Sequence, residues 1–591
     1  MRALTRAILA AAALAALAGA AHAATYYVAP TGADTNPGTR EAPFATPQKG
    51  LDVAQPGDAV LLERGATFRG GLRFPRDGAE EQPIRLDAYG EGPRPEILGS
   101  IEATGWEPHE GEVYKLAIPK ERFGPGYTQP YSVYEYDSGR APVRLLRDQA
   151  TPTARGHFFY DQPAGVLYVI TSDGAPPARH RLEVPVLPQL VDLTGRSWIQ
   201  IENLSFLFGN CRHIGFTDCH DCLIRNCASL FVGDYGNPNI MVIRCERVQI
   251  VGCFLYESAN CGVMFTDRTT RCLVSGCTIV KCSSNDGVTI HSGGRNAQGI
   301  FEGQAGNHNT IENNVIGLCP EESIDITSGD YHRVSGNICY GNGNPGIIIG
   351  HGSDHITILN NISFGNARSG IHIAGNEAEG ARGENAVVQN LVYDNGYPGL
   401  EIDAPRTSVL NNTVVDSRER TAVRISPGGR GSVLRNNVVA TLGAEIPHPS
   451  LQFLGSTPAL LEVMLDHNLF YHAGKHDGRV LVTGDGRMTP AEFLGRYQTG
   501  QDTLCVPPGF APASLGPGRP YYFLAENSPA LDAGADVGLV CDGAGPDLGW
   551  KERGRLERAA PRYPERLIEG RGDESAAILA LWGKLDGDTG K

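Results

Sequence analysis

The chain has 591 residues, of which 41% are hydrophobic, and it carries a formal net charge of −15. A chain of this length and composition can bury a large core. The acidic balance argues against a nucleic acid or an anionic membrane surface as its partner, because both would repel it. We therefore expect no nucleic acid as partner. We also expect a monomer.

Residues 1–23 have the pattern of an export signal. Arg2 and Arg6 precede an apolar stretch, residues 7–19, and a small-x-small cleavage site ends at Ala23. The apolar stretch is shorter than the about 20 residues that cross a bilayer as a helix. We predict a periplasmic or secreted protein without a membrane span.

Residues 24–100 are predicted to form an N-terminal cap and the first coils of a solenoid. Residues 60–62 and 84–86 are short apolar segments of the kind found in strands. A short helix over residues 46–54 would cover the open end of the solenoid, where unpaired strand edges would otherwise be exposed.

The N-terminal segment also carries a family resemblance. Residues 26–39, YYVAPTGADTNPGT, followed by residues 43–46 and 56–58, are similar to the opening of secreted proteins of the pectate-lyase-like β-helix superfamily. Members of that superfamily mostly act on polysaccharides. The resemblance implies a right-handed parallel β-helix and a polysaccharide substrate.

Residues 101–195 interrupt the pattern. Residues 113–116, 157–161 and 165–170 are predicted to be antiparallel strands of an inserted β module. The insertion resembles one found in β-helix glycoside hydrolases such as those of family 141. Two roles stay open, because the module either decorates one coil or forms a wall of a substrate cleft.

Residues 196–475 are predicted to be the central coils, because they contain a sequence repeat. Most units end roughly 22 to 29 residues apart, with one longer step around residues 293–306. Short strands such as residues 370–373 alternate with turns, and no helical stretch separates them. The sequence therefore predicts an all-β fold, a right-handed parallel β-helix with an inserted antiparallel β module. The units end at Asn226-Cys227, Gly252-Cys253, Gly276-Cys277, Asn313-Asn314, Gly336-Asn337, Asn360-Asn361, Gln389-Asn390, Asn411-Asn412 and Asn436-Asn437.

The 14 cysteines follow this repeat, and twelve of them lie within residues 211–339. In an exported protein such a number usually indicates disulfides. The pair Cys219 and Cys222 also has metal or redox spacing, but no second pair completes a zinc site. We favour columns of small apolar thiols packed inside the coils, since the register of the later asparagines is occupied by Cys227, Cys253 and Cys277.

Residues 476–560 are expected to hold C-terminal coils and loops, and residues 561–591 a tail. Thr489 has the character of a helix N-cap, with a proline directly after it. Residues 573–585 are compatible with a short helix that caps the last coil.

The candidate site lies on one strand row of the repeat. In a Gly-Ile-x-Ile strand the two apolar side chains point inward and x points outward. Alignment of the units predicts one outward row formed by Met264, Thr289, Asp325, Ile348, His372, Glu401 and Arg424. The central coils then place ten ionisable residues on one outer face: Asp286, His291, Glu321, Glu322, Asp325, His351, His372, Glu401, Asp403 and Arg424.

Charged residues on an exposed strand face are often only solvated. Here like charges would stack ~4.8 Å apart and repel one another unless a cation, a substrate or a shared proton compensates. We therefore predict a functional site with two clusters, one around Asp286 and Asp325 and one around His372. Catalytic roles are expected for Asp325, His351, His372, Glu401 and Asp403, and substrate contacts for His291, Arg368 and Arg424.

Spacing limits what these groups can do. Carboxylates on adjacent rungs lie roughly 5 Å apart, which suits a metal site or a nucleophile and acid/base pair. Glu401 and Asp403, two residues apart on one strand, are expected about 7 Å apart, closer to the separation of an inverting pair.

The acidic residues have a second resemblance. Residues 321–325, EESID, with Asp286 one coil earlier, resemble the calcium-binding pattern of family 9 polysaccharide lyases. The resemblance implies that Ca²⁺, an ion that carboxylate oxygens suit, is held by Asp286, Glu321, Glu322 and Asp325. In that family a lysine one coil later acts as base, but the aligned residue here is Ile348. Either His351 or His372 takes the base role, or the reaction is not β-elimination; a third alternative is that the acids are structural and hold no metal.

We therefore expect an exported enzyme that cleaves glycosidic bonds of a polysaccharide, with hydrolysis by Asp and Glu ahead. The first alternative is a Ca²⁺-assisted lyase or uronate epimerase. The second is a carbohydrate-binding scaffold without catalysis, since long β-helices present wide faces.

Overall fold

The structure is a computed structural model of the chain. It describes residues 23–124, 126–137, 142–233, 236–292, 305–350, 353–375, 382–418, 421–443, 445, 447–474, 479–499, 502–512, 521–539, 541 and 543–551. The predicted export signal and the predicted helix at residues 573–585 lie outside these ranges, apart from Ala23.

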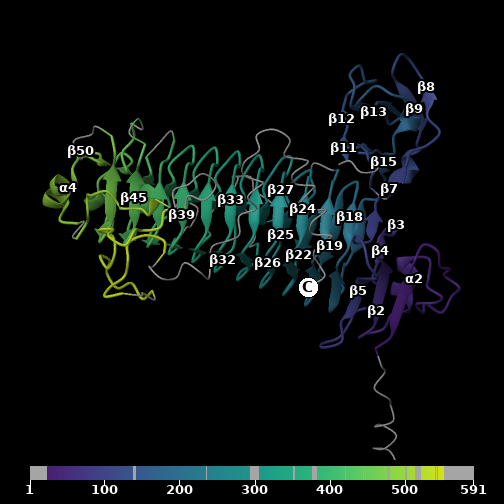
Figure 1. Cartoon of the computed structure of the whole chain (residues 1–591), viewed down its shortest axis with the longest axis horizontal. Helices are drawn as coiled ribbons and strands as arrows, with labels where there is room; N and C mark the ends of the chain where they lie inside the picture. Colours follow the sequence, from purple (N-terminus) through teal and green to yellow (C-terminus); the bar gives the residue numbers. More distant parts are fainter. Residues whose placement is uncertain are drawn as a thin grey trace, which may run out of the picture.

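The described residues form a long solenoid with three parallel sheets along its axis (Figure 1). Sheet 1 has 14 strands in the order β1 (Thr25–Val28), β2 (Ala59–Glu63), β5 (Ile84–Tyr89), β17 (Ile199–Glu202), β20 (Leu223–Arg225), β23 (Gln249–Val251), β26 (Leu273–Ser275), β29 (Thr310–Glu312), β32 (Arg333–Ser335), β35 (Thr357–Leu359), β38 (Ala386–Val388), β41 (Ser408–Leu410), β44 (Val433–Arg435) and β47 (Met464–Asp466).

Sheet 2 has 13 strands, which are β3 (Thr67–Arg69), β6 (Glu96–Leu98), β18 (Ser205–Leu207), β21 (Ala228–Leu230), β24 (Phe254–Tyr256), β27 (Thr278–Val280), β30 (Val315–Gly317), β33 (Ile338–Tyr340), β36 (Ile362–Phe364), β39 (Leu391–Tyr393), β42 (Thr413–Val415), β45 (Val438–Thr441) and β48 (Leu469–His472).

Sheet 3, with 14 strands, runs from β4 (Leu72–Arg73) through β16 (Gln189–Asp192), β19 (Arg212–Thr217), β22 (Ile240–Ile243), β25 (Val263–Thr266), β28 (Val288–His291), β31 (Ile324–Ile326), β34 (Ile347–Ile349), β37 (Ile371–Ile373), β40 (Leu400–Ile402), β43 (Val423–Ile425), β46 (Leu451–Phe453) and β49 (Leu481–Thr483) to β50 (Gly486–Met488). All its neighbours pair in parallel except β49 with β50. The predicted parallel β-helix is confirmed.

The residue pairs that end each unit have two structural tasks. The first residue of every pair adopts a left-handed conformation, with φ between 52° and 67°, which asparagine and glycine tolerate best. The second residue points inward and forms a ladder: the Asn361 side chain donates to Asn390 Oδ1 (3.0 Å) and to Val334 O (2.9 Å). The repeat signature is therefore a turn followed by a buried amide.

The cysteines continue the same ladder toward the N-terminus. The amide of Cys277 donates to Asn314 Oδ1 (2.8 Å), and the amide of Cys253 contacts Cys277 Sγ (3.4 Å). All 14 cysteines are free thiols, and the twelve within residues 211–339 are buried. The prediction of packed thiol columns is confirmed.

The inserted module stands off the N-terminal third of the solenoid (Figure 1). It has one sheet of β11 (Val143–Arg144), β10 (Tyr134–Glu135), β15 (Leu182–Pro185) and β7 (Ser100–Glu102), and another of β12 (Leu146–Arg147), β13 (His157–Asp161), β14 (Val166–Ile170), β9 (Tyr114–Ala117) and β8 (Glu107–Pro108). The pairing is antiparallel as predicted, except that β12 and β13 run parallel.

The ends of the solenoid are covered by helices that begin at threonine caps. The short helix predicted over residues 46–54 is α2 (Pro47–Val53), capped by Thr46. The predicted N-cap Thr489 begins α4 (Pro490–Tyr497) and forms a capping box with Glu492. The remaining described helices are α3 (Pro458–Leu461) and the 3₁₀ turns at Lys120–Phe123, Pro177–Arg179 and Pro427–Gly429. No helix in the described ranges is long and apolar enough to span a membrane.

Candidate functional site

The predicted row exists on sheet 3. Its strands pair so that each x residue lies opposite the next, which gives the continuous row Met264, Thr289, Asp325, Ile348, His372, Glu401 and Arg424. Because adjacent strands lie ~4.8 Å apart, Asp325 and His372 are two rungs, about 10 Å, from each other. Ile348 stands between them, so no lysine occupies this row between the two clusters.

The row is less exposed than an outward strand face would suggest. Met264, Thr289 and Glu401 are all buried, with exposed fractions of 7%, 3% and 5%. Asp286, expected on the open face, is only 1% exposed. The expectation of a fully solvated wall is wrong for these residues, because neighbouring side chains contact them: Thr289 donates to Asp286, and Glu401 lies between Ser369 and Arg424. Asp325 and His372 keep partial exposure.

Three of the four predicted calcium ligands converge in what we call the acidic cluster, defined as Asp286, Glu321, Glu322 and Asp325. Asp286, Glu321 and Glu322 each offer an oxygen, and these oxygens lie within 4.8 Å of one another. The Thr289 hydroxyl donates to Asp286 Oδ2 (2.6 Å) and the Glu322 amide donates to Asp286 Oδ1 (2.9 Å).

The acidic cluster holds more negative charge than its surroundings stabilise. Burial raises the pKa of Asp286. Burial, followed by the hydrogen bond and the charge of Asp286, raises the pKa of Glu322 to about 10. Burial and Asp286 also raise the pKa of Glu321. Two buried carboxylates in contact cannot both stay ionised without compensation, so the pair requires a proton or a cation.

The donor chemistry of the acidic cluster fits Ca²⁺. The ion prefers six to eight oxygen ligands, with carboxylates prominent among them. Each Asp286 oxygen accepts a hydrogen bond, from the Thr289 hydroxyl or from the Glu322 amide, and keeps a second lone pair for a cation. Asp286, Glu321 and Glu322 would therefore hold the ion. Asp325, three residues after Glu322 on β31, would offer a further carboxylate.

The second group, which we call the histidine centre, consists of His372, Glu401, Asp403 and Arg424. His372 Nε2 lies 2.8 Å from Asp403 Oδ2 and 3.8 Å from Glu401 Oε1. The guanidinium of Arg424, one strand further, forms an ion pair with Glu401. Burial lowers the pKa of Arg424, yet its contact with a carboxylate favours the charged pair.

The two carboxylates of the histidine centre differ in their surroundings. Glu401 is engaged on both oxygens, because Arg424 contacts Oε1 and the Ser369 hydroxyl donates to Oε2 (2.8 Å). Asp403 uses Oδ2 for His372, and no donor among the described residues reaches Oδ1. Its side chain is 25% exposed, against 7% for Glu401. Asp403 is therefore the more exposed of the two carboxylates, although its Oδ1 atom is itself buried.

Strand geometry alone predicts a separation of about 7 Å between Glu401 and Asp403. In the structure an oxygen of each, together with His372 Nε2, lies within 4.8 Å. The expectation is wrong because both side chains turn toward the imidazole. The backbone supports this arrangement, since the Asp403 amide donates to Ile373 O (2.8 Å), at the end of the strand that carries His372.

The predicted substrate-binding residues take three different positions. His291 contacts Ser292 O (2.7 Å) and Met264 Sδ (3.3 Å) at the end of β28, beside the acidic cluster. Arg368 is exposed, and its guanidinium lies 5.7 Å from the ring centroid of Tyr397. Arg424 lies within the histidine centre. His351 lies outside the described residues.

Two site residues do not emerge from the sequence pattern. Ser369 positions Glu401 by its hydrogen bond, and Tyr397 packs with Arg368 on the turn before β40. A signal for Ser369 exists in the repeat: it stands three residues before His372, as Asp286 stands before Thr289 and Glu322 before Asp325. Tyr397 has no comparable signal.

Comparison with known proteins supports the fold. A family model described as the right-handed beta helix region matches residues 190–361 and 286–439. No curated protein matches the sequence. Among solved structures, XylC in complex with xylose has 13% sequence identity and a TM-score of 0.44, with 82% of this chain and 87% of that chain covered.

Two further solved structures are similar at the same level. Pectate lyase Pel9A has 14% identity and a TM-score of 0.39, with 91% of this chain and 98% of that chain covered. The A-module of the Azotobacter vinelandii mannuronan C-5 epimerase AlgE6 has 14% identity and a TM-score of 0.36, with 76% of this chain and 91% of that chain covered. The sheets and the family match agree on the fold: the described residues form a parallel β-helix, and residues 190–439 match the model of the right-handed beta helix region.

Proposed function

We propose that the chain is an exported enzyme that cleaves glycosidic bonds of a polysaccharide at the histidine centre. The observation that carries the proposal is the convergence of Glu401, Asp403 and His372, which each offer an atom within 4.8 Å of the others, at a place where the side chains of His372 (19%) and Asp403 (25%) are partly exposed. Two carboxyl groups held in place by neighbouring side chains can supply an acid and a nucleophile.

In the hydrolytic version, which we favour, Glu401 and Asp403 are the carboxyl pair. Their oxygens lie within 4.8 Å of each other, which is nearer to the separation in retaining than in inverting enzymes. One carboxyl attacks the anomeric carbon while the other protonates the leaving glycosidic oxygen, and a water molecule that returns a proton to that second carboxyl then releases the sugar. His372 orients Asp403, and Ser369 and Arg424 fix Glu401. Arg368 and Tyr397 on the neighbouring turns contact the sugar.

A second candidate is β-elimination or C5 epimerisation of a uronate, with His372 as the base. The acidic cluster favours it, because three carboxylates within 4.8 Å fit a cation about two rungs from His372. We propose that Asp286, Glu321, Glu322 and Asp325 bind Ca²⁺ there. A bound cation would neutralise the carboxylate of a uronate.

The experiment is a panel of acidic and neutral polysaccharides, each followed for reducing ends and for the absorbance of an unsaturated product. Hydrolysis yields reducing ends alone, whereas elimination yields both. Asp403→Asn and His372→Gln should each lower kcat by about 10²- to 10⁴-fold. Gln452→Ala, in the next position of the same row, serves as the matched control and should keep full activity.

Two outcomes would contradict the proposal. If Asp403→Asn and His372→Gln turn over the substrate as fast as the control, the chemistry lies elsewhere. If the protein binds a polysaccharide, cleaves no member of the panel and leaves the C5 configuration of its uronates unchanged by NMR, it is a binding scaffold.

A further inference from the structure

The last coil of the solenoid leaves large apolar side chains in solvent. Leu460 on α3 is 72% exposed, Met464 on β47 is 48% exposed, and Leu494 on α4 is 38% exposed. Isolated apolar residues on a surface are normal, but a group of them at one end indicates a surface that is covered.

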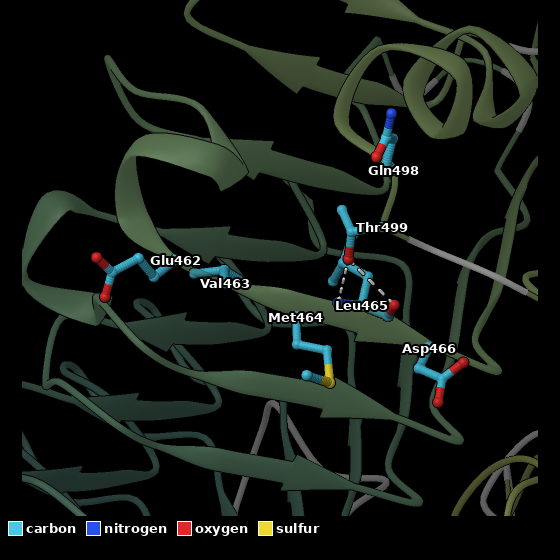
Figure 2. A pocket seen from close by; sticks show the side chains of 7 residues that line it. All are labelled: Glu462, Val463, Met464, Leu465, Asp466, Gln498 and Thr499. Atoms are coloured by element: carbon cyan, nitrogen blue, oxygen red, sulfur yellow. Dashed lines mark hydrogen bonds between the residues drawn. The ribbon is translucent and has the colours of Figure 1, made fainter.

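Of these three side chains, Met464 lines a pocket at the end of sheet 1 (Figure 2), and α3 and α4 carry the other two. Its volume is about 400 Å³, and β47 forms its floor between α3 and the segment that follows α4. The lining residues are Glu462, Val463, Met464, Leu465, Asp466, Gln498 and Thr499. Such a pocket has room for one or two large apolar side chains.

The free edge of β47 does not accept another strand. Leu465 donates its amide to Thr499 Oγ1 (2.9 Å), and the Thr499 hydroxyl donates back to Leu465 O (3.3 Å). One side chain thus occupies the backbone groups that a further strand would use. The occupant of the pocket must therefore bind through side chains, as an amphipathic helix does.

The chain itself supplies such a segment. Residues 573–585 carry apolar side chains at helical spacing i, i+3, i+4 and i+7, namely Ile578, Leu581, Trp582 and Leu585. The acidic Asp573 at its start suits a helix N-cap. This segment lies outside the described residues, and its partner surface lies outside the candidate functional site.

The position where the described chain ends places this segment within reach. The last described residue, Lys551, donates from Nζ to Asn360 Oδ1 (3.4 Å), and Asn360 follows β35, four strands before β47 in sheet 1. Four coils along the solenoid are about 19 Å. The 21 residues between Lys551 and Asp573 (573 − 551 − 1) span about 25 Å as a flexible linker.

We propose that residues 573–585 form an amphipathic helix that docks on the last coil, with Leu581 and Trp582 in the pocket over β47. The helix covers Leu460, Met464 and Leu494. It completes the C-terminal cap of the solenoid as α2 completes the N-terminal one.

Hydrogen exchange of the full-length chain tests the proposal. The double variant Leu581→Asp/Trp582→Asp should expose the pocket, so that amides of residues 458–466 exchange about tenfold faster than in the wild type. The reciprocal variant Met464→Glu should have the same effect, and it should fold normally because Met464 is half-exposed. Lys584→Ala, off the apolar stripe, is the matched control and should leave exchange unchanged.

Exchange rates that stay at the wild-type value in both the double variant and Met464→Glu would overturn the proposal. Protection that rises with protein concentration, together with a dimer in sedimentation, would also overturn it, because a second copy would then cover the surface.

Discussion

A buried histidine should make the N-terminal coils sensitive to acid. The His213 side chain has no solvent exposure, and its ring contacts Ser229 Oγ (2.7 Å) through Nδ1 and accepts from the Gly209 amide (2.9 Å) through Nε2. Burial lowers the pKa of His213 to about 3. The ring is therefore neutral in the folded state, with its hydrogen on Nδ1, and both ring nitrogens have a hydrogen-bond partner.

The sign and size of the effect follow from linkage. The unfolded chain protonates this ring near pH 6.5, and the folded chain does so only near the pKa of about 3. The contribution of His213 to stability is therefore complete above pH 6.5 and is lost as the pH falls. Each pH unit costs about 1.4 kcal/mol, so the loss at pH 5 is about 2 kcal/mol.

The assay must separate the effect of His213 from that of Glu322. The raised pKa of Glu322 makes the folded state more stable as the pH falls from 7.5 to 5, which is opposite to the effect of His213. Urea unfolding of the wild type and of His213→Gln at pH 7.5 and pH 5 provides the difference. Gln keeps one donor and one acceptor for Ser229 and Gly209. Between the two pH values, the free energy of unfolding should fall about 2 kcal/mol less in the variant than in the wild type.

An equal change with pH in the two proteins would refute the reasoning. A direct control is the imidazole NMR signal of His213, which should show no protonation at pH 5. A second buried ring, His332, whose pKa burial lowers to about 4, should behave in the same way.

Three further predictions concern the ladder and the site. Asn361→Ala removes four buried hydrogen bonds and should lower the free energy of unfolding in urea by about 3 kcal/mol. Cys277→Ala in the same column should lower it by about 1 kcal/mol, and equal losses would contradict the amide ladder. Ser369→Ala frees Glu401 and should lower kcat about tenfold with KM unchanged, whereas a change in KM alone would contradict a positioning role. Ca²⁺ should raise the Tm by several degrees, and a chelator should reverse the increase. Glu322→Gln should abolish this response, and a wild-type Tm that changes with neither reagent would contradict the calcium site.

The sequence predicted the order of residues along the row because two periodicities determine it, the alternation of side chains along a strand and the length of the repeat. Alternation of side chains along a strand decides which residues point outward, and the repeat decides which units stack. Both are local properties, so Asp325, His372 and Glu401 could be placed on one strand row from the sequence alone. The pairing of Glu401 with Arg424 follows from the same register.

Burial and side-chain direction do not follow from these periods. Glu401 is outward in register yet only 5% exposed, because Ser369 of the preceding unit and Arg424 of the following unit contact its two oxygens. Asp403 and Glu401 are closer than strand geometry suggests, since both converge on an imidazole contributed by another coil. Ser369 completes that arrangement from a turn position.

The amino-acid sequence by itself thus determined the solenoid, its register and the stacked amides and thiols, because each depends on residues at fixed spacing along one unit. Only the tertiary structure decided which of the stacked carboxylates is enclosed and which is open, because that depends on contacts between units. Glu401 is enclosed between Ser369 and Arg424, and Asp403 keeps partial exposure, for this reason.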